Sequence, residues 1–326
     1  MIRTKILGTG SYAPDKVLTN HDIEKMVDTS DEWIQLRTGI RERRIAPEDW
    51  ATSDLAYRAG KNALEMAGVE ASELDLIIVA TVTPDSSFPS TACILQEKLG
   101  ATRAAGFDMA AACSGFIFAL SQADAYIKSG IYKRILVIGA ETLSKITDWT
   151  DRNTCVLFGD GAGAVVLGPS DDESGILSTH LHTDGSMGYL LELPAGGSRI
   201  PASPASVAEG QHYIKMRGNE TFKVAVRALE EVVLESIEHN GMEAGDIDLL
   251  VPHQANLRII QATAKRLDMP MEKVVLTVQK YGNTSAASVP MALDEAVRDG
   301  RIKKGMNILL EAFGGGLSWA SAMIKW

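Results

Sequence analysis

The sequence predicts an α/β protein built from two similarly folded halves, and three observations lead to this class. Segments with helical spacing of apolar residues alternate along the chain with short apolar runs of strand length. Those runs are continuously apolar, as in strands that helices cover on both faces of a sheet. Parts of the first half also recur in the second half at one constant spacing.

The repeat is visible in two motifs of each half. "GVEASELDLIIV" begins at Gly68 and "GMEAGDIDLLVP" begins at Gly241, an offset of 241 − 68 = 173 residues. "RILVIGAE" and "NILLEAFG" place Ile135 opposite Ile308, and 308 − 135 is again 173. The same offset lays the strand-like residues 3–11 over 176–184. We therefore expect halves at 1–172 and 173–326, which meet near the acidic, turn-forming "PSDDESG".

The individual elements follow from periodicity and end signals. In the first half we expect a helix that Ser53 caps and that ends near residue 67, a helix at 113–130, and strands at 74–82 and 134–141. In the second half we expect helices at 219–241, 256–268 and 286–300, and strands at 247–252, 274–278 and 307–313. The glycine-rich "GDGAGAVVLG" runs into a strand and lacks the Lys-Ser/Thr ending of a phosphate loop, so we interpret it as turn and strand.

Composition and charge narrow the class of protein. The 326 residues are 45% hydrophobic, and no apolar run approaches the length of a membrane span. The three cysteines form no C-x-x-C pair, which argues against a disulfide scaffold and favours a reducing compartment. The first residues lack the apolar stretch of a secretory signal, so we expect a cytoplasmic protein. A net charge of −10 argues against non-specific binding to nucleic acid.

Cys113 is the candidate nucleophile, because it lies in "DMAAACSGF" at the expected start of a helix. Unpaired N–H groups at a helix N-terminus favour a thiolate over a thiol, and the small neighbouring residues leave room for a bulky substrate. A cysteine in an apolar stretch can equally be a small core residue, so both interpretations stay open. Cys93 and Cys155 lack this setting and are expected to be structural.

His253 and Asn283 are the candidate partners of this cysteine. His253 ends the strand "DLLVPH" and Asn283 follows a strand in "YGNTSAAS", where open α/β sheets place functional groups. The alternatives are an ordinary surface or core histidine and a turn asparagine. The spacing 253 − 113 = 140 also fits a papain-like protease, but the signature C-G-[SA]-C-[WY] is missing and the duplicated halves do not suit that fold. The glycines of "FGGG" suit either an oxyanion hole or a tight turn.

Five motifs together carry a family resemblance: "DEWIQLRTGIRERR", "AAACSGF", "VPHQANLRI", "GNTSAAS" and "LLEAFGGG". With them the chain resembles the thiolase superfamily, and within it the 3-oxoacyl-acyl carrier protein synthase III family. The resemblance runs from about residue 30 to the C-terminus. It implies a thiolase-like fold of two βαβαβαββ halves in five layers, helix, sheet, helix, sheet and helix, which agrees with the repeat.

The resemblance implies an acyltransferase that initiates type II fatty acid synthesis. Cys113 would take an acyl group from acyl-CoA, usually acetyl-CoA, and malonyl-acyl carrier protein would lose CO2 and attack the resulting thioester. His253 and Asn283 would donate hydrogen bonds to the malonyl thioester oxygen as enolate charge develops. The backbone N–H groups of Cys113 and Gly315 would hold the oxyanion of acyl transfer. The resemblance implies no metal and no cofactor, since acyl-CoA is a substrate.

The binding residues carry over from the resemblance position by position. Matches to CoA contacts are Trp33 and Arg152, which would sandwich the adenine, and Arg37, Thr38, Gly218, Phe222, Ala255 and Asn256. Matches to the docking segment for acyl carrier protein are Gln254, Ala255, Asn256, Leu257 and Arg258, with Lys223, Lys265 and Arg266 extending a basic patch. Phe88 matches a residue that reaches the acyl pocket of the partner in a homodimer. Asn153 and Arg217 depart from the family pattern, which affects the expected contacts of the adenine and the tunnel mouth.

The chain length and branching of the primer stay open, because they depend on the pocket beyond Cys113. Two other functions also stay open. One is a related condensing enzyme that uses malonyl-CoA in polyketide synthesis. The other is a carrier-protein binder that kept the fold without condensing activity.

Overall fold

The fold is organised around two mixed β-sheets, and the computed structural model describes residues 2–326. The five-stranded sheet has the order β1 (Thr4–Tyr12), β7 (Gly161–Pro169), β6 (Ile135–Glu141), β4 (Leu76–Ala80) and β5 (Ala105–Met109). The four-stranded sheet has the order β11 (Leu249–Pro252), β12 (Asn307–Gly314), β13 (Ser318–Lys325) and β8 (Gly175–Thr183). The pairs β4–β5 and β4–β6 in the first sheet and β11–β12 in the second are parallel, as strands joined by helices are. The remaining neighbouring pairs of both sheets are antiparallel.

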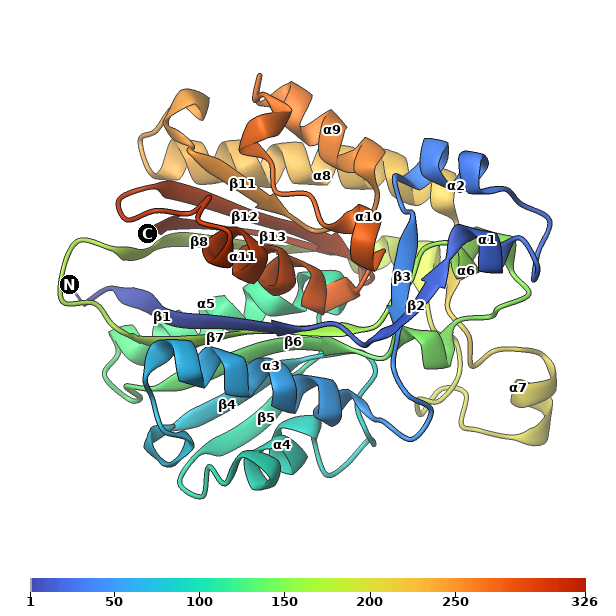
Figure 1. The fold of residues 1–326 in the computed structure, drawn as a ribbon, viewed down its shortest axis with the longest axis horizontal. Helices are drawn as coiled ribbons and strands as arrows, with labels where there is room; N and C mark the ends of the chain where they lie inside the picture. The colour runs from blue at the N-terminus through green and yellow to red at the C-terminus, as the bar shows by residue number, and fades with distance from the viewer. Residues whose placement is uncertain (1) are drawn as a thin grey trace.

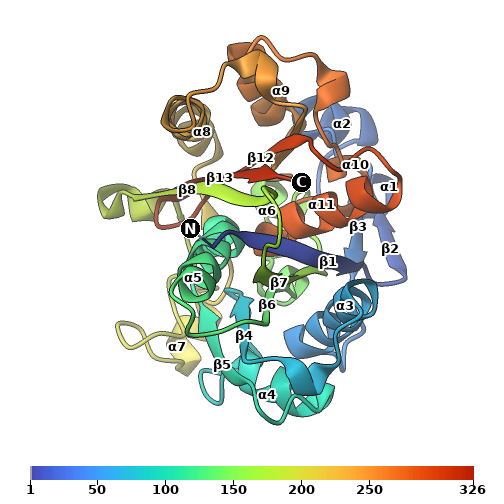
Figure 2. The same ribbon diagram turned by 90° about the vertical axis from the view of Figure 1, so that its left-hand side faces the viewer.

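Helices and sheets alternate in five layers (Figure 2). The outer helices of the first sheet are α3 (Thr52–Ala67) and α4 (Thr91–Leu99), and those of the second are α8 (Gly218–His239) and α9 (Leu257–Arg266). Between the sheets lie α5 (Gly115–Lys128) and α11 (Ser288–Arg298). The predicted five-layer thiolase-like fold is therefore confirmed.

Smaller elements gather at one end of the molecule, on the right in Figure 1. Two small antiparallel sheets are formed by β2 (Lys16–Thr19) with β3 (Glu42–Ile45) and by β9 (Leu191–Glu192) with β10 (Lys215–Met216). The short helices are α1 (Asn20–Ile23), α2 (Asp31–Thr38), α6 (Arg152–Cys155), α7 (Pro204–Ala208) and α10 (Val278–Tyr281). No helix within residues 2–326 combines the length and the hydropathy needed to cross a bilayer.

The sequence repeat extends to strand register and backbone conformation. Leu76 lies opposite Ile135 in the first sheet, and Leu249 lies opposite Ile308 in the second. The central helices start at residues 115 and 288, again 173 apart, and each follows a 3₁₀ turn, at 112–114 and 285–287. Even the backbone strain recurs, because the first residue of each turn is non-glycine with φ of 45° and 48°.

One apolar core joins the two halves. It combines the inner faces of both sheets with α5 and α11, so that Val137, Phe116, Ala292 and Leu310 belong to a single cluster. The two halves thus share their central layer, and the boundary at residue 172 stays a prediction about the sequence.

Two local expectations are wrong. Ser53 does not cap α3, because the helix begins at Thr52 and Ala51 is at the cap position. The Asp54 carboxylate accepts the Ala51 N–H at 2.8 Å, and the Ser53 hydroxyl donates to Asp85. The expected strand at 274–278 reduces to a single bridge between Leu250 and Val274. The Gln254 amide oxygen accepts the N–H groups of residues 277 and 278, at 2.8 and 3.0 Å, so a strand ladder cannot use them.

Candidate active site

The three candidate catalytic residues line one cavity of about 600 Å³ between the two halves. Cys113 comes from the turn before α5, His253 follows β11, and Asn283 follows α10. All eight positions matched to CoA contacts line the same cavity, namely Trp33, Arg37, Thr38, Arg152, Gly218, Phe222, Ala255 and Asn256. The structure therefore brings together residues that are up to 250 positions apart, from 33 to 283.

Cys113 is held where β5 passes through a 3₁₀ turn into α5. Ala112 has a φ of 45°, a strained conformation for a residue with a side chain, and it sets the direction of the following cysteine. From the other half, Gly314 at the end of β12 approaches so closely that an added Cβ would lie 2.6 Å from the Cys113 nitrogen. Glycine is therefore required for β12 to reach the nucleophile.

Several groups act on the protonation state of Cys113 in opposite directions. Burial raises the pKa of the thiol to about 12, and the charge on Glu141 acts in the same direction. The nearby Ser285 hydroxyl lowers the pKa of the thiol. The helix start at Cys113 favours the thiolate, so burial opposes the expected effect of the helix N-terminus.

His253 is buried and neutral, with its ring orientation fixed by one serine. Its backbone N–H donates to the Glu311 carbonyl oxygen at 2.8 Å, and its Nδ1 lies 2.5 Å from Ser288 Oγ. Ser288 Oγ accepts the Gln254 N–H at 3.3 Å and keeps its O–H to donate and a second lone pair to accept with. In the arrangement in which this O–H is donated to Nδ1, the proton of the neutral ring is on Nε2, where it can be donated to a substrate. Burial lowers the pKa of His253 to about 3.

Asn283 presents a second donor to the cavity. Its Oδ1 accepts the backbone N–H of Ser285 at 2.9 Å, and a backbone N–H can only donate. The amide nitrogen of Asn283 is therefore the end left for a substrate. Backbone bonds to Leu157 and Gly159, at 2.9 and 3.0 Å, hold the residue against the first half of the chain.

A second, smaller pocket of about 180 Å³ continues beyond the nucleophile. Cys113 lies at its junction with the large cavity, and Gly315 contributes to its wall. An added Cβ at Gly315 would lie 3.1 Å from the Leu191 carbonyl oxygen, so this segment too is tightly packed. The other lining side chains are mostly apolar: Val82, Leu143, Ile146, Phe158, Leu191, Leu193 and Ile214.

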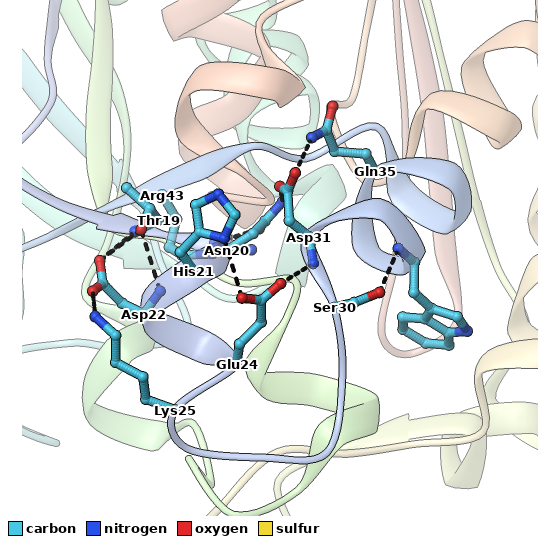
Figure 3. A network of polar contacts seen from close by, with 11 residues as sticks. Thr19, Asn20, His21, Asp22, Glu24, Lys25, Ser30, Asp31, Gln35 and Arg43 are labelled. Atoms are coloured by element: carbon cyan, nitrogen blue, oxygen red, sulfur yellow. Dashed lines mark hydrogen bonds and ion pairs between the residues drawn. The ribbon is translucent and has the colours of Figure 1, made fainter.

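Polar contacts hold α2 at the mouth of the large cavity (Figure 3). Ser30 Oγ accepts the Trp33 N–H at 3.1 Å and caps the helix. The Asp31 carboxylate accepts the Asn20 side-chain amide at 2.9 Å, and Asn20 in turn accepts from Arg43 at 2.9 Å. Arg43 is fully buried, so within the basic run near residue 40 it stabilises the fold and cannot contact CoA.

Two arginines flank the Trp33 ring at this mouth. The Arg37 guanidinium lies 5.8 Å from the ring centroid and that of Arg152 lies 5.0 Å from it. Arg152 also donates to the Asp28 carbonyl oxygen at 2.9 Å. An adenine sandwiched by Trp33 and Arg152 therefore requires Arg152 to move off the ring. Asn153 and Arg217 both stand exposed near this entrance, and Arg217 packs over Tyr189 at 5.0 Å.

The expected docking residues divide into surface and core. Arg258 is exposed and stacks over Phe222 at 5.3 Å, and Lys223 and Lys265 are exposed as well. Gln254 is only 1% exposed, and its side-chain amide donates to the carbonyl oxygens of Pro252 and Val275. The expectation that Gln254 contacts a carrier protein is therefore wrong. Arg266 pairs with Glu230 at 3.3 Å, which lowers its value as a free positive charge.

Phe88 lies outside both cavities and is 86% exposed. Leu257 is partly buried under α2, where an added Cβ on Gly39 would lie 2.5 Å from its Cβ. Three further residues lie near the reacting groups without having been predicted from the sequence: Ser285, Ser288 and Glu141. The two serines belong to the motif "GNTSAAS", which was the available signal, whereas nothing in the sequence around Glu141 places it near the cysteine.

Fold and site together define a thiolase-fold condensing enzyme. Family models for 3-oxoacyl-[acyl-carrier-protein] synthase III and for its C-terminal part match residues 107–185 and 237–326. The β-ketoacyl-[acyl-carrier-protein] synthase III of Xanthomonas campestris pv. campestris is 60% identical over 325 residues, which cover 100% of this chain and 99% of that protein. The chain belongs to the 3-oxoacyl-[acyl-carrier-protein] synthase III family and is an acyltransferase.

Solved structures agree with this assignment. The 3-oxoacyl-[acyl-carrier-protein] synthase III of Aquifex aeolicus VF5 is 53% identical, with a TM-score of 0.92 over 99% of this chain and 100% of that chain. The priming β-ketosynthase of the R1128 polyketide biosynthetic pathway is 38% identical, with a TM-score of 0.92 over 99% of this chain and 96% of that chain.

Proposed function

We propose that Cys113 carries the acyl group in the condensation that initiates fatty acid synthesis, the reaction of this family. The observation that carries the proposal is the single cavity that Cys113, His253 and Asn283 share with the eight matched CoA positions. Acyl-CoA enters from the mouth at Trp33, and its thioester reaches the sulfur at the junction of the two pockets. The oxyanion formed there is held by the N–H groups of Cys113 and Gly315.

The condensation step uses the two side-chain donors. Malonyl-acyl carrier protein loses CO2, and the enolate oxygen of its thioester accepts from His253 Nε2–H and the Asn283 amide. A neutral histidine suits this role because its N–H is a weak acid. It can donate a hydrogen bond to the enolate oxygen without protonating the carbanion, which an imidazolium would do. The carbanion attacks the acyl-Cys113 thioester, a C–C bond forms, the C–S bond to Cys113 breaks, and 3-oxoacyl-carrier protein leaves. These steps require no cofactor or metal.

The carrier protein docks where positive charge surrounds the mouth. Lys223, Arg258 and Lys265 are exposed, and within residues 2–326 none of them takes part in an ion pair. An acidic partner approaching a chain of net charge −10 needs such a local patch. Arg258 is the central residue, since its guanidinium stacks on Phe222 at the cavity wall.

The small pocket receives the primer. Its apolar walls suit a hydrocarbon chain, and the exposed Phe88 is free to cap the pocket of a partner subunit in a homodimer. The three cysteines are unpaired, as befits the cytoplasm, which we propose as the location.

A polyketide-type condensing enzyme shares this fold, as the R1128 priming ketosynthase does, so the extender substrate is the discriminating property. Purified protein is incubated with acetyl-CoA and either malonyl-acyl carrier protein or malonyl-CoA, and products are identified by mass. The proposal expects 3-oxobutyryl-carrier protein and an acetyl group on the Cys113 peptide. Product from malonyl-CoA alone identifies the polyketide-type enzyme. Absence of product in both arms, with acetyl-CoA and with a panel of longer and branched acyl-CoAs, identifies a binder without condensing activity.

A further inference from the structure

The two side-chain donors to the enolate lie in different segments of the second half. His253 follows β11, and Asn283 follows α10, at a spacing of 283 − 253 = 30 positions. One enolate oxygen can accept from both only if each donor atom lies about 2.7–3.1 Å from it. The sheet does not fix this arrangement, because within residues 2–326 only a single bridge, between Leu250 and Val274, joins β11 to the chain before Asn283.

Gln254 joins the two segments through its side chain. The amide nitrogen donates to the carbonyl oxygens of Pro252 and Val275, at 2.8 and 3.0 Å. The amide oxygen accepts the backbone N–H groups of Thr277 and Val278, at 2.8 and 3.0 Å. A primary amide has two N–H donors and two lone pairs, so these bonds use its whole capacity. Since Gln254 is 1% exposed, its side chain serves only the interior of the protein.

On the His253 side the connection is direct. Gln254 is the next residue in the chain, and its side chain returns to the Pro252 carbonyl oxygen, on the other side of the histidine. The backbone N–H of Gln254 donates to Ser288 Oγ at 3.3 Å, and the same oxygen lies 2.5 Å from His253 Nδ1. A shift of Gln254 therefore affects both the backbone and the ring orientation of the histidine.

On the Asn283 side the connection passes through one helical turn. The two residues whose N–H groups Gln254 accepts are the N-cap and the first residue of α10. The turn is closed by a hydrogen bond from the Gly282 N–H to the Val278 carbonyl oxygen at 3.0 Å, and Asn283 comes next. The segment 277–288 is thus tied to the histidine loop at its start by Gln254 and at its end by the hydroxyl of Ser288. Asn283 lies between these two ties.

We propose that Gln254 is a positioning residue for decarboxylation, which holds the donors of His253 and Asn283 at the separation that one enolate oxygen requires. The inference rests on the proposed function of these two side chains. Catalytic groups generally need to be held within about 0.5 Å of the productive geometry. Gln254 lines neither pocket, and its hydrogen bonds all lie within the second half, whereas Cys113 belongs to the first. Stabilisation of the enolate therefore depends on this bridge, and acylation of Cys113 does not.

Three variants of Gln254 separate the length of the side chain from its chemistry. Gln254→Met keeps the approximate volume and removes all four side-chain hydrogen bonds. Gln254→Asn keeps the amide but is one methylene shorter, so it can bond to one segment without reaching the other. Gln254→Glu keeps the length, and in the neutral form that burial favours it can still accept both N–H groups and donate once. If the bridge is what matters, Gln254→Glu should retain more activity than Gln254→Asn.

The test measures decarboxylation of malonyl-carrier protein and acylation by acetyl-CoA separately, per active site, with sites counted as acetyl-Cys113 at saturation. We expect Gln254→Met and Gln254→Asn to lower kcat for decarboxylation about a hundredfold, the usual effect of a displacement near 1 Å. KM for malonyl-carrier protein should not change, because only the transition state loses stabilisation. Gln254→Glu should lose less than about tenfold in kcat, and acylation should stay within about twofold of wild type in all three variants.

Gln279→Met is the matched control. Gln279 belongs to α10, and its side chain donates to the Leu276 carbonyl oxygen at 3.2 Å, within its own segment and without a link to the histidine loop. This variant loses a glutamine hydrogen bond in the same turn, yet it should decarboxylate at the wild-type rate.

A general loss of structure lowers both half-reactions together, so it differs from a loss of position. Equal loss of both half-reactions in folded variants, wild-type decarboxylation by Gln254→Met, or equal rates for Gln254→Asn and Gln254→Glu overturns the role of Gln254. If Gln254→Met does not fold, the comparison of the other two variants decides. Undiminished decarboxylation by His253→Ala and Asn283→Ala instead overturns the proposed function of those side chains.

Discussion

Replacing Ser288 by alanine isolates the group that orients His253. In the Nε2–H tautomer of His253, the O–H of Ser288 donates to Nδ1 at 2.5 Å, and Ser288 is only 1% exposed. Without it, Nδ1 of the Nε2–H tautomer becomes a buried acceptor without a partner, at a cost of about 1–3 kcal/mol. At about 1.4 kcal/mol per factor of ten, the useful tautomer is disfavoured roughly 5- to 150-fold. We expect decarboxylation of malonyl-carrier protein to slow by up to that factor.

Release of labelled CO2 measures the rate, and ¹⁵N chemical shifts of the His253 ring report which nitrogen carries the proton. Acylation of Cys113 by acetyl-CoA should stay within about twofold of wild type, because it does not depend on the histidine donor. Ser321→Ala is the matched control, since Ser321 is an equally buried serine that donates to the Val232 carbonyl oxygen at 3.1 Å. If Ser288→Ala decarboxylates at the wild-type rate with an unchanged Nε2–H signal, the assigned role of Ser288 is wrong.

Three further predictions concern the half-reactions, the partner and the primer. His253→Ala and Asn283→Ala should each lower decarboxylation by about a hundred- to a thousandfold and spare most acylation of Cys113; equal loss of both half-reactions would contradict the division of roles. Arg258→Glu should raise KM for malonyl-carrier protein at least tenfold at low salt without changing acylation by acetyl-CoA. Lys304→Glu is the control, because Lys304 is 87% exposed and lies at the end of β12 away from the cavity; it should leave this KM unchanged. A dry apolar cavity of about 150 Å³ holds benzene, so the small pocket of about 180 Å³ should admit primers of about four to six carbons; a panel of acyl-CoAs in which only acetyl-CoA reacts would show that the pocket is closed in the assembled enzyme.

The fold could be predicted because its signals are local and repeated. Apolar strands between amphipathic helices specify a covered sheet, and a constant offset shows that the arrangement occurs twice. The error at 274–278 has a physical reason. Apolar composition favours a strand, but the side-chain oxygen of Gln254 accepts two backbone N–H groups that lie 23 and 24 positions further along the chain. Strand propensity describes what a segment prefers in isolation. Here the hydrogen bonds of the buried Gln254 amide prevent the segment from joining the sheet.

Of the site, only the residues that belong to the sequence motifs could be predicted. Cys113 follows from the expected start of a helix and His253 from the end of a strand, whereas the strand expected before Asn283 is missing and α10 precedes this residue. The grouping of the three in one cavity could not be read from spacing. The helix start at Cys113 could be predicted from the sequence, whereas the depth of burial, which raises the pKa of the thiol, could not. Glu141 acts on Cys113 through packing within the first half, and that proximity is a property of tertiary structure.

The shared central layer also has a consequence for synthesis of the protein on the ribosome. The apolar inner face of the first sheet, with α5 upon it, packs against strands that belong to the last 154 residues (326 − 172 = 154). At about 5–20 residues per second those residues take roughly 8–30 s to be made. For that time the emerging first half presents an open apolar surface. Ribosome-associated chaperones should therefore contact the nascent chain in this interval, and slowing translation after residue 172 should increase aggregation.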